Sequence, residues 1–470
     1  MPQMPPSRRS VLTGFGSLAA TAGLGSAASG CAAPSAAGAG RTRLRFWHLY
    51  GGGDGVTMQA MLDAFRAGHP GVGLESATLQ WGPAYYTKLG MAGAGGRAPE
   101  VAALHLSRLP GFAPGRLLDP FDLDLLARHG VRPEHFPEAI WRRGASGGAQ
   151  YAIPFDTHPF VLFYNTEVCA KAGLLDGNSP GKREEDGEKG QGKRGAKGRS
   201  GGKARLRPLA GVGEFTRALR AAREATGHPG LVIETLGNDT VGPWRLFATF
   251  YAQAGGTVLD PTATRVTLDD AKALRVLEWM RSLVEDGHAP RRVDYTGAVS
   301  RFNNGDSAFL ITGEWEVSTY LTTELPFSMT RIPNLFGRPS AFADCHTFVL
   351  PHQADRGGAS NEAAHRFVAW MLRHSTDWAA GGHVPAYRPV LSEPAYLELH
   401  PQSEYRSVVD DVALDPPAWF AGSASAMQIE LGAALSGVLT GSRSPRDGLD
   451  EVRKRLRDLL ATPDPFGGRA

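Results

Sequence analysis

Apolar residues along the chain recur with two different periods, and the alternation of those periods predicts strands and helices in turn. Residues 44–47 alternate as a half-buried strand does, and apolar residues then recur at helical spacing over 58–65. Strands are predicted at 72–80 and 101–106, with a helix around 85–91 between them. Strands that alternate with helices are typical of βαβ units in a parallel sheet, so the predicted fold class is α/β.

The boundaries of the first helix are marked in the sequence. A Gly-rich turn at 51–55 follows the first strand, and Asp54 within it is expected to be the N-cap. Gly68 and Pro70 are expected to end the helix, because glycine terminates helices and proline cannot continue them.

The same alternation resumes after residue 150. The predicted elements are a strand at 151–164, helices around 212–226, 241–254 and 269–285, a strand at 307–312, and a last amphipathic helix with Leu449, Val452, Leu456 and Leu459 on one face. Residues 176–205 interrupt this pattern and contain no Val, Ile, Leu, Met, Phe, Trp or Tyr. Such a stretch cannot repay the entropy of ordering, so it is predicted to be a disordered insertion, solvated or touching anionic lipid through its basic excess.

The N-terminus carries signals for export. Arg8 and Arg9 precede a weakly apolar run rich in Gly, Ala and Ser, as in a twin-arginine signal. Cys31 follows small residues and resembles a lipoprotein cleavage site, so residues 1–31 are predicted to be a signal peptide that ends at a lipidated Cys31. The protein is then exported and anchored by lipid to the outer face of the cytoplasmic membrane. The alternative is an ordinary N-terminus with a chance arginine pair.

Size, charge and cysteine content narrow the function classes. No other segment has the roughly 20 consecutive apolar residues that span a bilayer, and the chain after Cys31 exceeds a single hydrophobic core, which favours two lobes. A net charge of +3 with mixed acids and bases is too small to indicate nucleic acid binding. Cys169 and Cys345 are too few for a disulfide framework and are expected to be buried, unpaired thiols.

Two motifs that often indicate catalysis lack the flanking strands and helices that they require. Residues 190–195 match G-x-G-x-x-G but fall in the predicted disordered insertion, without a preceding strand. Residues 144–148 match the nucleophile elbow G-x-S-x-G, but a strand pattern follows them where a helix is needed, so Ser146 is predicted to be a turn residue. The histidines have no zinc-site spacing. We therefore predict no catalytic residue, no metal site and no cofactor.

Aromatic and polar residues instead gather where the predicted strands end. In open α/β sheets the carboxyl ends of strands open onto the ligand crevice, so these residues are expected to converge. Flat rings suit the C–H faces of sugars, and carboxylates, histidine and arginine suit their hydroxyls. Each aromatic residue is individually as compatible with a buried core position. The candidates at strand ends are His48, Tyr50, Trp81, Tyr85, Tyr86, His105, Ser107 and Arg108, joined by Asp156, His158, Trp244, Glu314, Trp315, His346, Tyr387 and Arg388.

At these residues the chain resembles the extracellular solute-binding proteins of bacterial carbohydrate ABC importers, which are related to the maltose-binding protein. The resemblance covers nearly all of the chain after Cys31 except the insertion, and Glu100 stands where the family usually has Asp. The strings that carry it are Leu44-Arg-Phe-Trp-His48, Phe65-Arg-Ala-Gly-His-Pro70, Ala98-Pro-Glu-Val101, Ile153-Pro-Phe-Asp-Thr-His158 with Phe163-Tyr-Asn165, Phe302-Asn-Asn-Gly305 before Gly313-Glu-Trp315, and Val384-Pro-Ala-Tyr-Arg-Pro389.

The resemblance implies a two-lobed, periplasmic-binding-protein-like fold with a hinge and an interlobe cleft. It places the chain crossings near Ala149, Ala341 and Leu391. Lobe one would comprise residues 41–150 and 341–391, and lobe two 151–340 and 392–470 with the insertion.

The same resemblance implies a function and a site. The protein would act as a monomer that captures a sugar or oligosaccharide and delivers it to the permease subunits of an ABC transporter, with Trp315 stacked on a sugar ring. The implied contacts are His48, Trp81, Tyr85, His105, Arg108, His346, Tyr387 and Arg388 in the first lobe, and Asp156, Trp244, Glu314, Trp315 and Trp419 in the second.

Two alternatives remain open at this stage. The same fold could bind a glycerol phosphodiester or another polar solute such as a polyamine, with Arg108 and Arg388 serving a phosphate. An exported carbohydrate-active enzyme would need two facing carboxylates, for which Asp156 and Glu314 are the candidates.

Overall fold

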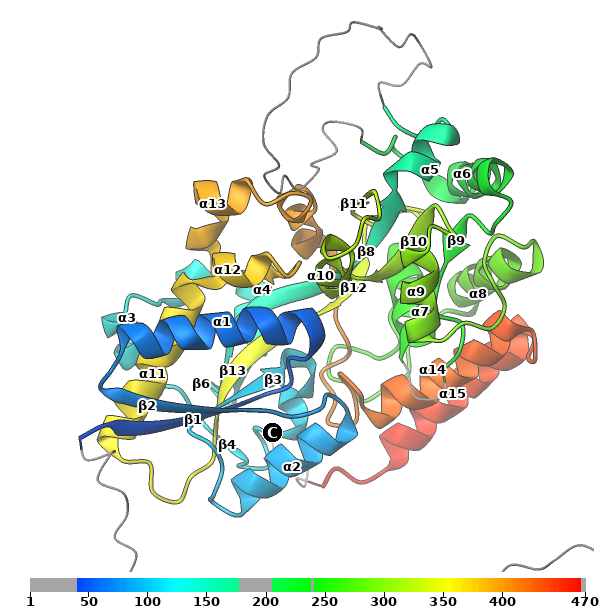
Figure 1. Ribbon diagram of the computed structural model, residues 1–470. Coiled ribbons are helices and arrows are strands. Elements are labelled where there is room, and N and C mark those ends of the chain that lie inside the picture. Colours follow the sequence, from blue (N-terminus) through cyan, green and yellow to red (C-terminus); the bar gives the residue numbers. More distant parts are fainter. Residues whose placement is uncertain (1–39, 177–204, 238–240, 466–470) are drawn as a thin grey trace, which may run out of the picture. The chain divides into compact units, whose positions relative to one another are not determined.

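The computed structural model describes residues 40–176, 205–237 and 241–465, and the described residues from Arg41 onward form one compact unit (Figure 1). The predicted signal peptide and Cys31 lie outside the described residues, as does the predicted insertion except its end residues Asp176 and Arg205. Among the described residues, no helix combines the length and apolarity needed to cross a membrane. Within the compact unit, strands form two main sheets, each with its own hydrophobic core.

The first sheet contains the N-terminal strands in the order β2-β1-β3-β13-β4, with β7 also paired to β13. Its strands are β1 (Thr42–His48), β2 (Val72–Thr78), β3 (Val101–His105), β4 (Leu118–Asp119), β7 (Ala152–Pro154) and β13 (His346–Pro351). Strands β1, β2 and β3 are parallel as predicted, but β13 runs antiparallel to β3. The prediction of a parallel sheet is therefore wrong at β13, because this strand enters from the second sheet and not through a helical crossover.

The helices that pack with the first sheet bury a core of phenylalanines, including Phe46, Phe65, Phe348 and Phe367. They are α1 (Gly52–Gly68), α2 (Pro83–Ala94), α3 (Leu123–Arg128), α4 (Glu138–Arg143), α11 (Gly358–Arg373) and α12 (Ser375–Ala379). Helix α1 ends at Gly68 as predicted. The expected N-cap is wrong, because the cap position is Gly51 and Asp54 lies inside the first turn, where it accepts a hydrogen bond from His383.

The second sheet is built around β8, which is ten residues long and buried throughout. Its order is β15-β12-β8-β10-β9, and β11 and β14 also pair with β8. These strands are β8 (Asp156–Asn165), β9 (Leu231–Val232), β10 (Phe309–Gly313), β11 (Phe327–Thr330), β12 (Ala341–Asp344), β14 (Val384–Pro385) and β15 (Val412–Ala413). The strand predicted at 151–164 is thus divided between the two sheets at Phe155.

The helices predicted after residue 205 are confirmed, within a residue or two at their ends. They are α6 (Gly211–Thr226), α7 (Gly242–Gln253), α8 (Asp270–Glu285) and α15 (Pro445–Ala461). Four helices that were not predicted pack with the same sheet: α5 (Thr166–Lys171), α9 (Tyr295–Asn303), α10 (Val317–Leu321) and α14 (Ala426–Thr440). Helix α15 buries Leu449, Val452, Leu456 and Leu459, the predicted apolar face. Helix α13 (Pro394–Leu397) follows α12 in the chain.

The chain passes between the two sheets at two tight places. Strand β7 is followed after Phe155 by β8, and β12 is followed after Cys345 by β13. These crossings lie a few residues after the positions expected near Ala149 and Ala341. A third segment, β14, pairs with β8 directly after His383. Three short stretches of chain therefore meet where the two sheets adjoin.

The structure also bears on the predictions for the two cysteines, for Ser146 and for the ends of the insertion. Cys169 and Cys345 are free and buried, as predicted. Residues 144–148 belong to a hairpin of β5 (Ala145–Ser146) and β6 (Ala149–Gln150), in which Gly147 and Gly148 have positive φ, so Ser146 is not on a nucleophile elbow. At the predicted insertion, Leu175 and Leu206 form an antiparallel bridge that brings its two ends together.

Candidate functional site

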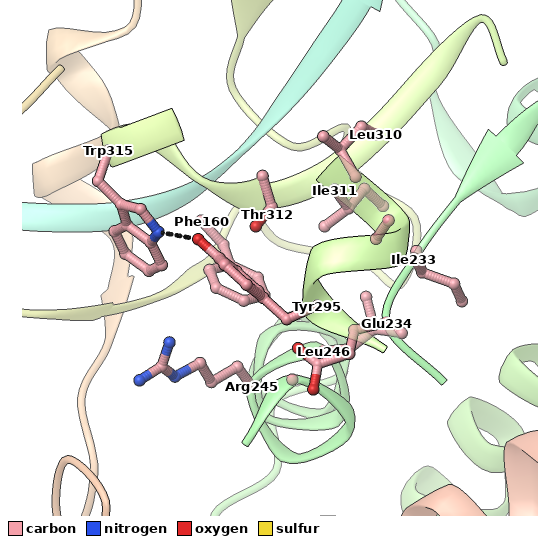
Figure 2. Close-up of a pocket in the computed structure, with 12 residues that line it drawn as sticks. Phe160, Ile233, Glu234, Arg245, Leu246, Tyr295, Leu310, Ile311, Thr312 and Trp315 are labelled. Atoms are coloured by element: carbon pink, nitrogen blue, oxygen red, sulfur yellow. Dashed lines mark hydrogen bonds between the residues drawn. The ribbon is translucent and has the colours of Figure 1, made fainter. Parts of the chain in front are cut away.

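Arg245, on the first turn of α7, lies among aromatic rings from both sheets. Its guanidinium carbon is 5.9 Å from the ring centre of Trp81, 5.6 Å from that of Trp315 and 5.5 Å from that of Phe342. Trp81 comes from the loop that joins β2 to α2, whereas Trp315 belongs to the short helix η4 (Glu314–Glu316) after β10. We call Arg245, Trp81, Trp315, Phe342 and Tyr295 the Arg245 site, and Figure 2 shows its part beside α7.

A small pocket of about 20 Å³ lies beside Arg245 and exposes both polar and aromatic groups. Tyr295 holds the Trp315 indole in place, because its hydroxyl accepts a hydrogen bond from Trp315 Nε1 (2.7 Å, Figure 2) and donates one to Glu316. The pocket is lined by Phe160, Ile233, Glu234, Gly242, Arg245, Leu246, Tyr295, Ala298, Leu310, Ile311, Thr312 and Trp315. A flat ring fixed beside a guanidinium is suited to a ligand with an apolar face and hydrogen-bonding edges.

Arg245 is poorly solvated for a charged group. Burial lowers the pKa of its guanidinium from the ordinary value, although the negative charge of Glu234 acts to raise this pKa. Within the described part of the chain, its Nε atom is buried and has no hydrogen-bond partner. A buried donor without a partner is costly, so an acceptor on a ligand would be stabilised strongly here.

The loop between β15 and α14 connects the two halves beside this site. Trp81 is 36% exposed and donates from Nε1 to Ser423 Oγ (3.1 Å). The guanidinium of Arg108 lies over the Tyr86 ring and donates from one Nη to the carbonyl of Ala421 (3.5 Å). These contacts join groups from the first-sheet half to a loop of the second-sheet half, so the Arg245 site lies where the two halves face each other.

A second group of candidates forms a sealed network, which we call the buried histidine cluster: Asp156, His158, His346, His383 and Glu314. Asp156 is its centre, because His158 Nδ1 donates to one carboxylate oxygen (3.1 Å) and His346 Nδ1 to the other (2.7 Å). His383 Nδ1 is 3.5 Å from Asp156 Oδ2 and 3.0 Å from Glu314 Oε1. Each of these side chains is at most 7% exposed.

Charges within the cluster are compensated by one another. Burial would lower the pKa of His383, but the charges of Asp54 and Asp156 outweigh it and hold this pKa well above its ordinary value. Burial would raise the pKa of Asp156, but the charge of His346 holds it well below the ordinary value. Burial raises the pKa of Glu314 to about 7. The cluster is thus a cationic imidazole held among carboxylates.

The structure separates the sequence-predicted ligand residues into three groups. Trp81, Trp315 and Arg108 lie at or beside the Arg245 site, and half-buried Trp419 lies in the adjoining loop. Asp156, Glu314 and His346 belong to the buried histidine cluster, with His105 packed against His346. The remaining candidates are buried at His48, Tyr85, Trp244 and Tyr387, or exposed at Arg388.

Most of the buried candidates use their polar atoms inside the protein, although His48 Nδ1 and the Glu314 carboxylate oxygens make no hydrogen bond among the described residues. Tyr85 donates to the carbonyl of Ala103 (2.5 Å), and Trp244 donates from Nε1 to Asp415 (2.9 Å). Tyr387 packs against Phe136 in the first core. Asp156 and Glu314, the pair considered for glycoside hydrolysis, are both fully buried and face His383.

Arg245, Tyr295 and Phe342 are the residues of the site that the sequence analysis did not identify. A signal for Arg245 was present, because Trp244, Phe247, Phe250 and Tyr251 recur at helical spacing and assign Trp244 to the buried face of α7. Arg245, the next residue, then projects elsewhere. No comparable signal marks Tyr295, which begins a helix without an aromatic pattern.

Comparison with models of known protein families shows to which family this chain belongs. The model of the family described as bacterial extracellular solute-binding protein matches residues 60–395, which is more than half of the 470 residues. The chain belongs to this family. Membership of an extracellular family means that this solute-binding protein is exported, and the family consists of binding proteins.

Solved structures confirm the two-lobed α/β fold of this solute-binding protein. The GacH receptor of Streptomyces glaucescens, solved unliganded and with acarbose, is 19% identical at a TM-score of 0.72, covering 89% of this chain and 98% of the receptor. The cyclic α-maltosyl-1,6-maltose binding protein of Arthrobacter globiformis is 20% identical (TM-score 0.68; 90% and 99% covered). The sugar-binding protein MalE of Xanthomonas citri is 18% identical (TM-score 0.69; 89% and 98% covered).

Proposed function

We propose that this solute-binding protein captures a sugar or oligosaccharide between its two lobes and delivers it unaltered to an ABC permease. One observation carries the proposal: Trp81 from lobe one and Trp315 from lobe two lie over the same guanidinium, that of Arg245. The names of the similar structures support the ligand class, since they refer to acarbose, cyclic maltosyl-maltose and sugar.

Each proposed contact has a physical reason. The indoles of Trp81 and Trp315 stack on the C–H faces of sugar rings, with Tyr295 keeping Trp315 in orientation. Arg245 and Arg108 donate hydrogen bonds to hydroxyl oxygens, and the Nε atom of each is buried without a partner in the described chain. Trp419, on the loop beside Arg108, completes the proposed set.

Binding energy in this arrangement is coupled to closure. A ligand that contacts both lobes at once has a higher affinity for the closed form, so it shifts the population toward that form. A permease that recognises the closed form then discriminates loaded from empty protein. A micromolar dissociation constant corresponds to about 8 kcal/mol, which a few stacked rings and hydrogen bonds supply after the costs of association.

The test of the ligand class is a binding screen by thermal shift, followed by calorimetry. We expect an oligosaccharide such as acarbose or maltose to raise the melting temperature, because ligand at a hundredfold excess over its dissociation constant adds about 2.7 kcal/mol of stability. Glycerol phosphodiesters and polyamines are the matched alternatives. A shift with either of them, and none with any saccharide, would contradict the proposal.

A substitution then connects the ligand to the site. We expect Trp315→Ala to weaken calorimetric affinity by about 1 to 3 kcal/mol, as for loss of a stacked aromatic anchor. The matched control is Trp141→Ala, which removes a half-buried indole that stacks on Phe136 in lobe one. Equal affinity in the two variants would remove Trp315 from the site. Reducing ends released from the bound saccharide, and lost in Glu314→Gln, would instead reveal an enzyme.

Export and anchoring are part of the same proposal. We propose that Arg8 and Arg9 direct the chain to twin-arginine export and that Cys31 carries the lipid that anchors a monomer to the membrane. In cell fractionation, Cys31→Ser should move the protein from the membrane to the soluble fraction. Retention of this variant in the membrane fraction would contradict lipid anchoring, whereas Arg8→Lys with Arg9→Lys should block export.

A further inference from the structure

The buried histidine cluster has the composition of a transition-metal site. We propose that Asp156, His158, His346 and His383 bind one divalent cation, with Zn²⁺ as the cation that best fits three imidazoles and a carboxylate. The proposal concerns the junction of the lobes and is independent of which solute the protein carries.

The ligand atoms are close enough to share one ion. All four residues offer a nitrogen or carboxylate oxygen within 4.8 Å of one another. From the Asp156 carboxylate, the three Nδ1 atoms lie at 3.1 Å for His158, 2.7 Å for His346 and 3.5 Å for His383. Tetrahedral zinc with bonds of about 2.0 to 2.1 Å separates its ligand atoms by about 3.3 Å. The observed separations lie on both sides of this value, so small side-chain rotations suffice once metal binding releases the Nδ1 protons that the histidines carry in the ligand-free network.

Groups behind the ligands resemble the outer shell of a metal centre. His383 Nε2 lies 3.1 Å from Asp54 Oδ1, which gives a carboxylate–histidine pair with Nδ1 directed at the cluster. Trp378 donates from Nε1 to Asp156 Oδ2 (2.6 Å). Such hydrogen bonds fix the ring orientation of a ligating histidine and the position of a ligating carboxylate.

Glu314 supplies an independent observation in favour of a cation. It is fully buried, and among the described residues neither of its carboxylate oxygens makes a hydrogen bond. His383 Nδ1, 3.0 Å from Glu314 Oε1, also lacks a hydrogen bond of acceptable geometry. These two groups face each other as an ion pair but make no well-aligned hydrogen bond among the described residues, which leaves both poorly satisfied in a ligand-free network. A divalent ion at this point satisfies both.

The position of the ligands assigns a mechanical role to the ion. Asp156 and His158, two residues apart, lie on one face of β8 in the second sheet, and His346 begins β13 in the first. His383 precedes β14, which pairs with β8. The ion would therefore join the strands by which the chain passes between the lobes. Widely spaced ligands also explain why no zinc motif is recognisable in the sequence.

The test is metal stoichiometry and thermal stability of the purified full-length protein. After EDTA treatment and dialysis, addition of ZnCl₂ should restore one Zn²⁺ per chain by elemental mass spectrometry and raise the melting temperature by several degrees. Substitution with Co²⁺ should give visible absorption bands of a tetrahedral site. Unbound Zn²⁺, with no shift and no Co²⁺ bands, would overturn the proposal and leave a purely hydrogen-bonded network.

Variants locate the ion. His158→Gln and His346→Gln should each lower Zn²⁺ affinity at least tenfold, whereas His352→Gln, which alters a half-exposed histidine paired with Asp119, should retain the stoichiometry. Retention by the cluster variants and loss by His352→Gln would overturn the assignment in favour of surface binding. The Co²⁺ spectrum of the unmodified protein keeps the test decisive if a cluster variant does not fold. Saccharide binding measured in EDTA reports separately on the proposed function.

Discussion

The Arg245 site and the buried histidine cluster are built from the same kinds of residue, yet they differ in how their polar groups are satisfied. Both combine side chains from the two halves of the molecule and both contain groups from η4, Trp315 in one and Glu314 in the other. In the cluster, Asp156 accepts hydrogen bonds from two histidines and Trp378. At the Arg245 site, a guanidinium lies under rings that contribute no acceptor in the plane of its N–H groups.

This difference separates a structural junction from a binding surface. Around Asp156, donors and acceptors are matched inside the protein, so a substitution there lowers the free energy of unfolding because buried partners lose their hydrogen bond. Where a donor has no acceptor inside the protein and can bind an acceptor on a ligand, a substitution lowers the affinity for that ligand. Neighbouring residues of one short helix thus serve two purposes, and measurements that separate stability from affinity test this division.

The largest expected effect is on stability, from Asp156→Ala. The substitution leaves His158, His346 and Trp378 without their common acceptor and His383 without a neighbouring negative charge. Breaking a buried charged network by removing one partner costs about 3 to 5 kcal/mol, to be measured by urea denaturation. The control is Asp63→Ala, which removes an exposed, solvent-screened ion pair with Arg66 and should change stability far less. Equal losses would mean that the cluster is not a structural junction.

The next effect is a pH dependence from Asp415, which is buried beside Trp244 and accepts hydrogen bonds from Trp244 and Gln428. Burial raises the pKa of this carboxyl to about 6, so between pH 4 and 6 the folded protein holds a proton that the unfolded chain has released. Its contribution to stability therefore falls as pH rises through this window, by about 3 kcal/mol in total.

Asp415→Asn removes this contribution; it keeps one of the two accepting oxygens and turns an NH2 group toward the other donor, a cost that does not depend on pH. The difference in unfolding free energy between the variant and the unmodified protein should move in favour of the variant as pH increases from 4 to 6, and then stay constant. A difference that does not change over this range would show that Asp415 is already ionised at pH 4 in the folded protein.

A smaller effect, on affinity alone, is expected from Arg245→Gln. Loss of the guanidinium should weaken solute binding about 10- to 100-fold, or about 1.4 to 2.7 kcal/mol. Stability should change little, because the charge is poorly solvated and its Nε has no partner among the described residues. Arg43→Gln, at an exposed pair with Glu75, is the control for loss of a charge. A large loss of stability with unaltered affinity would reverse the roles that we assign to the two regions.

The fold could be predicted well from the sequence, because apolar periodicity reports directly on which face of an element is buried. The amphipathic face of α15 and the helices α6, α7 and α8 agree with their apolar patterns. The continuous apolar run over 151–164 does not reveal that Phe155 separates two sheets. The residues before and after Phe155 are buried alike, so the apolar pattern does not change where the chain passes from one sheet to the other.

The candidate site was predictable only in part. Trp81 and His105 both stand at the end of a predicted strand, so the sequence pattern favours them equally as ligand-binding residues. In the structure, however, Trp81 is 36% exposed, whereas His105 is buried and hydrogen-bonded to Tyr86. Whether such a side chain is satisfied internally depends on residues distant in the sequence, as with Asp156 and His346. Local patterns carry no information about these pairings, so they identify chemistry-bearing residues but do not sort them by role.

The smallest effect is expected from shortening the predicted insertion, which belongs to neither region. The chain ends that flank residues 177–204 are held together, because Asp176 N donates to the carbonyl of Arg205 (2.8 Å) and Arg207 N to that of Leu174 (2.9 Å). Replacing 177–204 with Asn-Gly, a pair suited to a tight hairpin turn, preserves these bonds. Closing a shorter loop costs less entropy, so the variant should be as stable or more stable, by less than about 2 kcal/mol. Calorimetric melting measures this change, and solute affinity should be unaltered. A marked drop in melting temperature would mean that the segment packs against the lobes and contributes to their stability.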